Sequence, residues 1–118
     1  MPILLDERPV ISAADIETVG VNYVDHLNPD EVLDGTPTVE EVGGSDLTIS
    51  NIAINVETYV EAYTGDTVEI DNAVVFVLSS PDAGRYVIRI TVDTLPPSST
   101  AYAAAPRRFV RDLEFTFK

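Results

Sequence analysis

Residues 85–92 read Arg-Tyr-Val-Ile-Arg-Ile-Thr-Val and carry the clearest structural signal in the chain. Bulky apolar side chains stand at every second position (Tyr86, Ile88, Ile90 and Val92), and two of the other four positions hold arginine (Arg85 and Arg89). Successive side chains of a β-strand point to opposite faces of a sheet, so this period of two predicts a strand with one buried face.

Comparable signals recur along the chain at the close spacing expected of a β-sandwich. Further strands are expected at residues 32–42, 47–56, 67–70, 73–78 and 109–117. Between Ile49 and Ile52 the alternation slips by one residue, which predicts a β-bulge near Ser50 and Asn51. Residues 73–78 are apolar without a break, which predicts a strand buried on both faces.

These strand signals predict an all-β protein. We expect an immunoglobulin-like β-sandwich of about six or seven strands over residues 31–118. A small barrel is the alternative. The chain lacks both Cys and Trp, so the paired cysteines and core Trp of antibody domains are missing and the prediction concerns architecture alone.

Two segments do not fit the strand pattern, and both are candidates for contact with a partner. Residues 1–30 are interrupted by Pro2, Pro9 and Pro29 and predict an extended N-terminal arm. Residues 94–106 predict a loop far longer than a hairpin needs. The candidate contact residues in these segments are Val10, Ile11, Tyr23, Leu95, Pro96, Pro97 and Tyr102. The alternative is an arm and a loop that contact nothing.

Charge is segregated along the chain. Seventeen acids and one Arg give residues 1–84 a formal charge of −16, while six bases and three acids give residues 85–118 a charge of +3. Arg107, Arg108 and Arg111 are therefore expected to form a charged contact with an acidic partner. Arg111 falls on the apolar face of its strand, where its stem is expected to cover the sheet edge while its head reaches water.

The composition also restricts the classes of partner. A total of 118 residues, 45% of them apolar, fits one domain that buries its own core. With 20 acids against 7 bases, neither nucleic acid nor an anionic membrane is an expected partner. No apolar run is long enough to span a bilayer and the N-terminus has no signal-peptide pattern, so we expect a soluble protein made in a cytoplasm.

Candidate chemistry is sparse, and we expect neither an enzyme nor a cofactor. His26 is the single histidine, and no nucleophile motif accompanies it. Adjacent acids such as Asp6 and Glu7 are expected from composition, so they do not indicate a glycosidase. Bound calcium is an open alternative for two sets of oxygen ligands: Asp66, Glu69, Asp71 and Asn72, or Asp25, Asn28, Asp30 and Asp34.

Three short motifs, taken in order, resemble a known group of proteins. They lie at 28–34 (Asn-Pro-Asp-Glu-Val-Leu-Asp), 44–50 (Gly-Ser-Asp-Leu-Thr-Ile-Ser) and 75–88 (Val-Phe-Val-Leu-Ser-Ser-Pro-Asp-Ala-Gly-Arg-Tyr-Val-Ile). With the Arg-containing final strand, they are similar to small immunoglobulin-like structural proteins of tailed bacteriophages. Two features depart from that pattern: residues 35–42 lack the expected aromatic residue and Trp, and the loop at 94–106 is longer.

The resemblance implies a virion protein, made in the bacterial host cytoplasm, that binds the major capsid protein or subunits of the tail or portal and associates with its own copies. A capsid decoration (cement) protein is the preferred role, because an arm and an acidic body suit an outer layer that stays soluble before assembly. The alternatives are a fibre-tail or head-tail adaptor and, outside the phages, an extracellular adhesin or carbohydrate-binding module.

Overall fold

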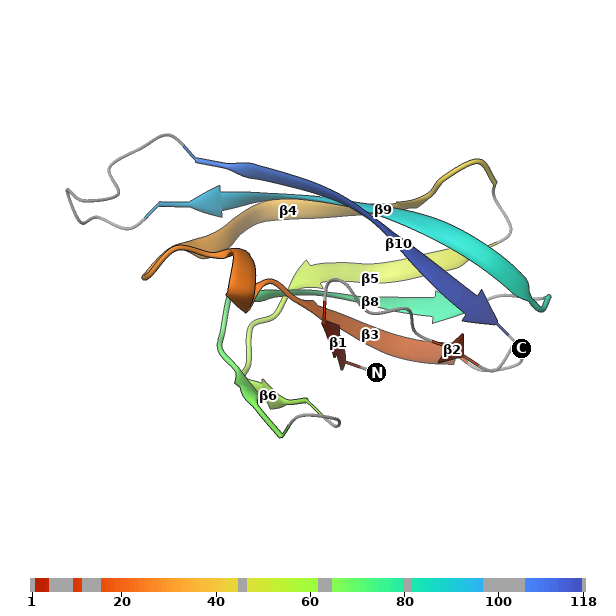
Figure 1. Cartoon of the computed structure of the whole chain (residues 1–118), viewed down its shortest axis with the longest axis horizontal. Coiled ribbons are helices and arrows are strands. Elements are labelled where there is room, and N and C mark those ends of the chain that lie inside the picture. The colour runs from red at the N-terminus through yellow and green to blue at the C-terminus, as the bar shows by residue number, and fades with distance from the viewer. Residues whose placement is uncertain are drawn as a thin grey trace.

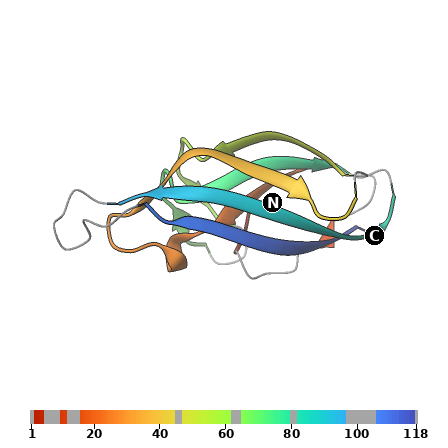
Figure 2. The same cartoon turned by 90° about the horizontal axis from the view of Figure 1, so that it is seen from above.

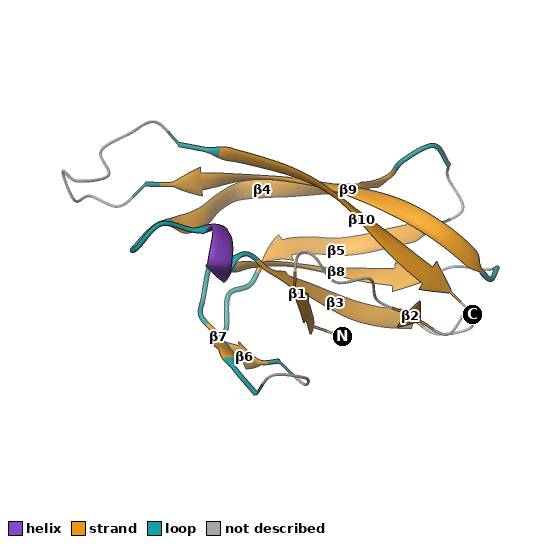
Figure 3. Cartoon of the chain, viewed as in Figure 1, coloured by secondary structure: helices purple, strands orange, loops and turns teal. Residues whose placement is uncertain are grey.

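The computed structural model describes residues 2–4, 10–11, 16–44, 47–61, 65–79, 82–96 and 106–117, with the backbone alone at 2–4 and 10–11. Its elements are β1 (Pro2–Leu4), β2 (Val10–Ile11), β3 (Ile16–Asn22), the 3₁₀ turn η1 (Val24–His26), β4 (Val32–Glu41), β5 (Thr48–Ile54), β6 (Tyr59–Val60), β7 (Thr67–Val68), β8 (Ala73–Ser79), β9 (Gly84–Leu95) and β10 (Arg108–Phe117). Figure 1 shows them as two layers with a small hairpin, β6–β7, at one end, and Figure 3 shows that strands dominate both layers. The predicted all-β class is confirmed.

One layer is a four-stranded sheet in the order β2-β10-β9-β4. Figure 2 shows β4, β9 and β10 running side by side along the molecule. In the central strand β9 the side chains of Ile88, Ile90 and Val92 are buried, while Arg89 on the opposite face is exposed. The alternation predicted for residues 85–92 is therefore confirmed, and the strand extends from Gly84 to Leu95.

The other layer has the order β1-β3-β8-β5. Its central strand β8 buries Val74, Phe76 and Leu78 completely and leaves Val75 and Val77 half-buried, as its unbroken apolar run predicted. The pairing of β5 with β8 shifts register between Ser50 and Ala53, and Asn51 has a φ of 54°. The predicted bulge is present at this position.

The core lies between the two sheets and contains side chains of both. Aromatic rings meet across it: the centroids of Phe76 in β8 and Phe115 in β10 are 6.4 Å apart in an edge-to-face arrangement. Such ring pairs add stability beyond the apolar area they bury. Val19, Leu33, Ile88, Ile90 and Phe117 belong to the same continuous buried cluster.

The arm predicted at residues 1–30 is wrong from Ile16 onward. Strand β3 pairs antiparallel with β8 along its whole length, and Val19 and Val21 belong to the core. Further upstream, the backbones of β1 and β2 pair in parallel with β3 and β10. The predicted number of strands, about six or seven, is smaller than the number in the described residues, because β1, β2, β3 and β6 were not expected.

The loop predicted at 94–106 begins two residues later than expected. Thr94 and Leu95 belong to β9, and Thr94 is 1% exposed. Pro97 and Tyr102 lie outside the described residues. Within the described part of the chain, no helix has the length and apolarity needed to cross a membrane.

Candidate functional site

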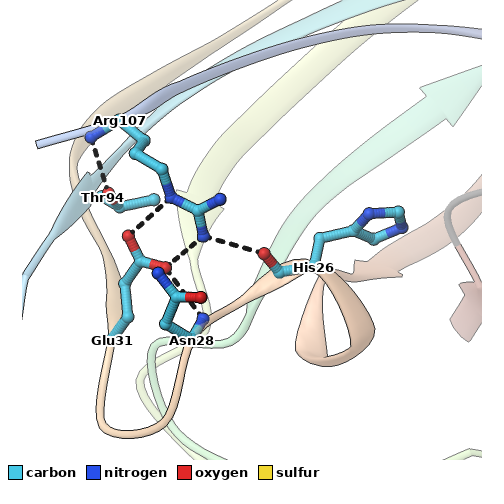
Figure 4. A network of polar contacts seen from close by, with 5 residues as sticks. All are labelled: His26, Asn28, Glu31, Thr94 and Arg107. Atoms are coloured by element: carbon cyan, nitrogen blue, oxygen red, sulfur yellow. Dashed lines mark hydrogen bonds and ion pairs between the residues drawn. The ribbon is translucent and has the colours of Figure 1, made fainter. Parts of the chain in front are cut away.

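A buried carboxylate ties two distant segments together at one end of the sandwich (Figure 4). Glu31, whose side chain is 4% exposed, accepts a hydrogen bond from Arg107 Nε at 3.0 Å and a second from Arg107 Nη2. The backbone N–H of Asn28 donates to the same carboxylate at 2.9 Å. Chiefly because of the hydrogen bonds from Arg107, the pKa of Glu31 falls from 4.5 to about 2.

The same arginine fixes the start of β10. Arg107 Nη2 donates to the carbonyl oxygen of His26 at 2.9 Å, and in Figure 4 the imidazole of His26 points away from the network. The backbone N–H of Arg107 donates to Thr94 Oγ1 at 2.9 Å, and the backbone N–H of Thr94 donates to the carbonyl oxygen of Arg107 at 2.9 Å. Thr94 in β9 and Arg107 next to the start of β10 are therefore bound directly to each other.

Three of the predicted contact residues gather around the ring of Phe109. Tyr23 stacks on it with centroids 5.7 Å apart, and the guanidinium carbons of Arg107 and Arg111 lie 4.9 and 5.4 Å from its centroid. Tyr23 is fully buried, and its burial raises the pKa of its hydroxyl. The prediction that Tyr23 contacts a partner is therefore wrong, because the side chain is part of the core. Arg111 is half-buried, as its position on the apolar face predicted.

Two arginines on the outer face of the β2-β10-β9-β4 sheet, Arg108 and Arg89, are paired with carboxylates of neighbouring strands. Arg108 Nε lies 2.7 Å from Asp93 Oδ1, and Arg89 Nε lies 2.9 Å from Asp112 Oδ1. Hydrogen bonds from these arginines lower the pKa of both aspartates. Two of the three arginines predicted to meet an acidic partner, Arg107 and Arg108, thus already have a carboxylate partner in the fold.

One end of the sandwich carries η1 and the β6–β7 hairpin (Figure 1). Described residues of this end line two open grooves. The first groove, about 420 Å³, is lined by Val24, Leu27, Asn28, Pro29, Asp30, Glu31, Val32, Glu69, Ile70 and Asn72. The second groove, about 360 Å³, is lined by residues 32–37, Ile52, Ala53, Ile54, Val56, Asp71 and Leu95. We call this region the grooved end.

Apolar side chains are concentrated at the grooved end. Eight large apolar side chains are exposed in the described part of the chain, and Val24, Val56, Ile70 and Leu95 line the two grooves. Of the predicted contact residues, Leu95 is 50% exposed here and Pro96 is half-buried beside it. The backbones of Val10 and Ile11 lie at the opposite end, paired with Thr116 and Phe117.

Asn55 holds the turn between the grooves, and sequence reasoning missed it. The side chain is 5% exposed, donates to the carbonyls of Glu57 and Glu69 at 2.9 and 2.8 Å, and accepts from the backbone N–H groups of Asn72 and Ala73 at 3.1 and 2.9 Å. Nothing local in the sequence indicates this role, because Asn55 lies inside the expected strand 47–56 and its four partners lie on both sides of the β6–β7 hairpin.

The described residues do not assemble a metal site. In the ranges that the structure covers, no three His, Cys, Asp or Glu side chains come together in a way that could hold an ion. The two calcium sets considered from sequence are therefore not gathered as sites. Comparisons with protein-family models, curated proteins and solved structures found no match to this chain.

Proposed function

We propose that the sandwich is immunoglobulin-like and that the protein is a non-enzymatic structural component of a tailed-bacteriophage virion, acting as a capsid decoration protein. The strand orders β1-β3-β8-β5 and β2-β10-β9-β4 support the first part. The longer strands β3, β4, β5, β8, β9 and β10 are divided between the two sheets in the same way as strands B to G of an immunoglobulin sandwich. The parallel pairing of β1 with β3 departs from the antiparallel order of that fold.

The grooved end is the observation that carries the role in assembly. Large exposed apolar side chains are ordinary when scattered, but a group of four around two grooves is typical of a protein contact surface. The same end holds the base of the 94–106 segment through Thr94 and Arg107. A rigid sandwich can thereby present the grooved end to a neighbouring subunit.

Decoration requires many weak copies that act together. Each copy on a capsid lattice contacts several coat subunits, and effective concentration turns modest individual contacts into a stable layer. Binding to the assembled shell and not to free subunits then stabilises the shell by mass action. The resemblance at residues 28–34, 44–50 and 75–88 supports this setting.

The test is the saturating stoichiometry of the purified protein on capsids that lack it and on isolated portal or tail complexes, measured by sedimentation and quantitative gel densitometry. A copy number comparable to that of the coat subunits is expected on capsids. A small number set by ring symmetry on the portal or tail would instead identify an adaptor. Binding to neither would refute a virion role.

A further inference from the structure

The walls of the two grooves carry charge of a single sign. Their acidic residues are Asp30, Glu31 and Glu69 in the first groove and Asp34 and Asp71 in the second, and none of the lining residues is Lys, Arg or His. Glu31 is neutralised by Arg107. No ion pair joins the other four to a basic side chain in the part of the chain that the structure describes. Each groove therefore combines apolar anchors with a carboxylate rim.

Three arginines in or next to the C-terminal strands already have a carboxylate partner that is not one of those four acids of the groove walls. Arg108 and Arg89 are bound to Asp93 and Asp112 on the outer face of the β4-β9-β10 sheet. Arg107 does not line the first groove itself, and its ion pair is with Glu31, which does. The grooved end therefore keeps the acidic character of the first 84 residues, with a negative potential at its rim.

Apolar and acidic groups alternate over short distances on these walls. In the first groove Ile70, 49% exposed, follows the exposed Glu69 in sequence, and Val24, 47% exposed, lies on η1 opposite. A ligand that fills such a groove must bury its own apolar side chains beside cations, because uncompensated carboxylates lose hydration on binding. An anionic or purely apolar ligand would remove water from the carboxylates without supplying a cation in its place.

We propose that the grooved end binds a basic, apolar-containing segment of a partner protein, in which Lys or Arg side chains meet Asp30, Asp34, Glu69 and Asp71 while apolar side chains contact Val24, Val56 and Ile70. This inference rests on the proposed role in assembly but not on its virion setting. From Arg107, Arg108 and Arg111 the sequence predicted that basic side chains of this protein meet an acidic partner. The inference is the reverse, because acidic side chains of this protein meet a basic partner.

The test uses the full chain labelled with ¹⁵N and a short synthetic peptide of alternating lysine and leucine, with amide chemical shifts recorded during titration. Shifts confined to residues 24–37, 52–57 and 69–72 are expected, with affinity that falls steeply as NaCl is raised past about 0.15 M, where the Debye length is about 8 Å. Peptides of alternating lysine and serine, and of glutamate and leucine, are expected to bind far more weakly.

Matched variants separate the groove from general charge. The double substitution Asp30→Asn with Glu69→Gln is expected to weaken the Kd roughly three- to tenfold. Glu17→Gln with Glu114→Gln removes the same charge away from both grooves and is expected to leave the Kd unchanged. Among apolar positions, Ile70→Ser is expected to weaken binding, while Val110→Ser, at a side chain of β10 that is 46% exposed and lines neither groove, is not.

Four results would overturn the inference: equal losses in both double variants, equal binding of the lysine–serine peptide, the same amide shifts with Ca²⁺ alone, or the same shifts on raising protein concentration without peptide. The last two would assign the end to a cation or to a second copy. Peptide binding that persists when capsids and tails are not bound would refute only the virion role. Capsid or tail binding without peptide binding would refute only the groove inference.

Discussion

Replacing Glu31 by Gln should expose how much the buried pair with Arg107 contributes to stability. The fall in the pKa of Glu31 from 4.5 to about 2 corresponds to roughly 3 kcal/mol of preference for the ionised form in the folded state. Because 41% of the Arg107 side chain is exposed, water screens the pair. We therefore expect Glu31→Gln to lower the free energy of unfolding by about 2 kcal/mol at pH 7.

The contribution of Glu31 to the free energy of unfolding should depend on pH in a defined direction. A carboxyl group whose pKa is depressed by folding stabilises the protein above its unfolded pKa, and that stabilisation disappears as pH falls through its folded pKa. The difference in unfolding free energy between wild type and Glu31→Gln should therefore be complete above about pH 4.5 and should shrink as the pH approaches about 2. All other carboxylates are common to both proteins and cancel in the difference.

Urea unfolding of both proteins at a series of pH values measures this difference, and ¹³C NMR titration of the Glu31 carboxyl measures its pKa directly. Asp93→Asn is the matched control, because it breaks an ion pair with Arg108 in which both side chains are exposed and should change stability little at any pH. An unfolding difference that does not vary with pH, or a Glu31 that titrates near its ordinary value, would refute the reasoning.

Three further substitutions test the packing. Asn55→Ala removes four hydrogen bonds and leaves buried backbone groups such as the N–H of Ala73 without a partner, so urea unfolding should show a loss of about 2–4 kcal/mol. Gly20→Ala would place Cβ 2.8 Å from the hydroxyl oxygen of Tyr59 and should lower the melting temperature, and a second substitution, Tyr59→Phe, should restore part of it. Phe115→Ala, at a fully buried ring, should cost about 3–5 kcal/mol in the same unfolding assay.

The strands from Val32 onward, except β6, could be predicted because their evidence is local. Alternation in residues 85–92 needs only that one face of β9 is buried and the other is wet, and the structure meets both conditions. The bulge at Ser50 and Asn51 left the same kind of local trace, a slip in the period of two. A strand of this kind can be recognised without knowing what packs against it.

Strand β3 was not recognised in this way because its outer face carries Gly20 and Asn22, and both faces of the strand are covered from Val19 to Asn22. Val19 and Val21 face the core, while Gly20 on the other face lies against Tyr59 of the β6–β7 hairpin. Asn22 is 6% exposed and donates through Nδ2 to Glu61 at 3.2 Å. Gly and Asn are depleted in strands, which weakens the signal of this segment even though Val19, Val21 and Tyr23 alternate with them. The hairpin that covers Gly20 and Asn22 lies about forty residues away in sequence.

The distribution of charge along the chain likewise did not give the distribution of charge on the surface. Arg107 and Glu31 are 76 residues apart in sequence, yet they neutralise each other, and Arg108 meets Asp93 in the neighbouring strand. Such ion pairs neutralise basic side chains of the C-terminal third, and the more numerous acidic side chains of the first 84 residues stay in excess. Because that excess borders the grooved end, the basic partner segment that we propose is inferred from the fold and not from the clustering of Arg in sequence.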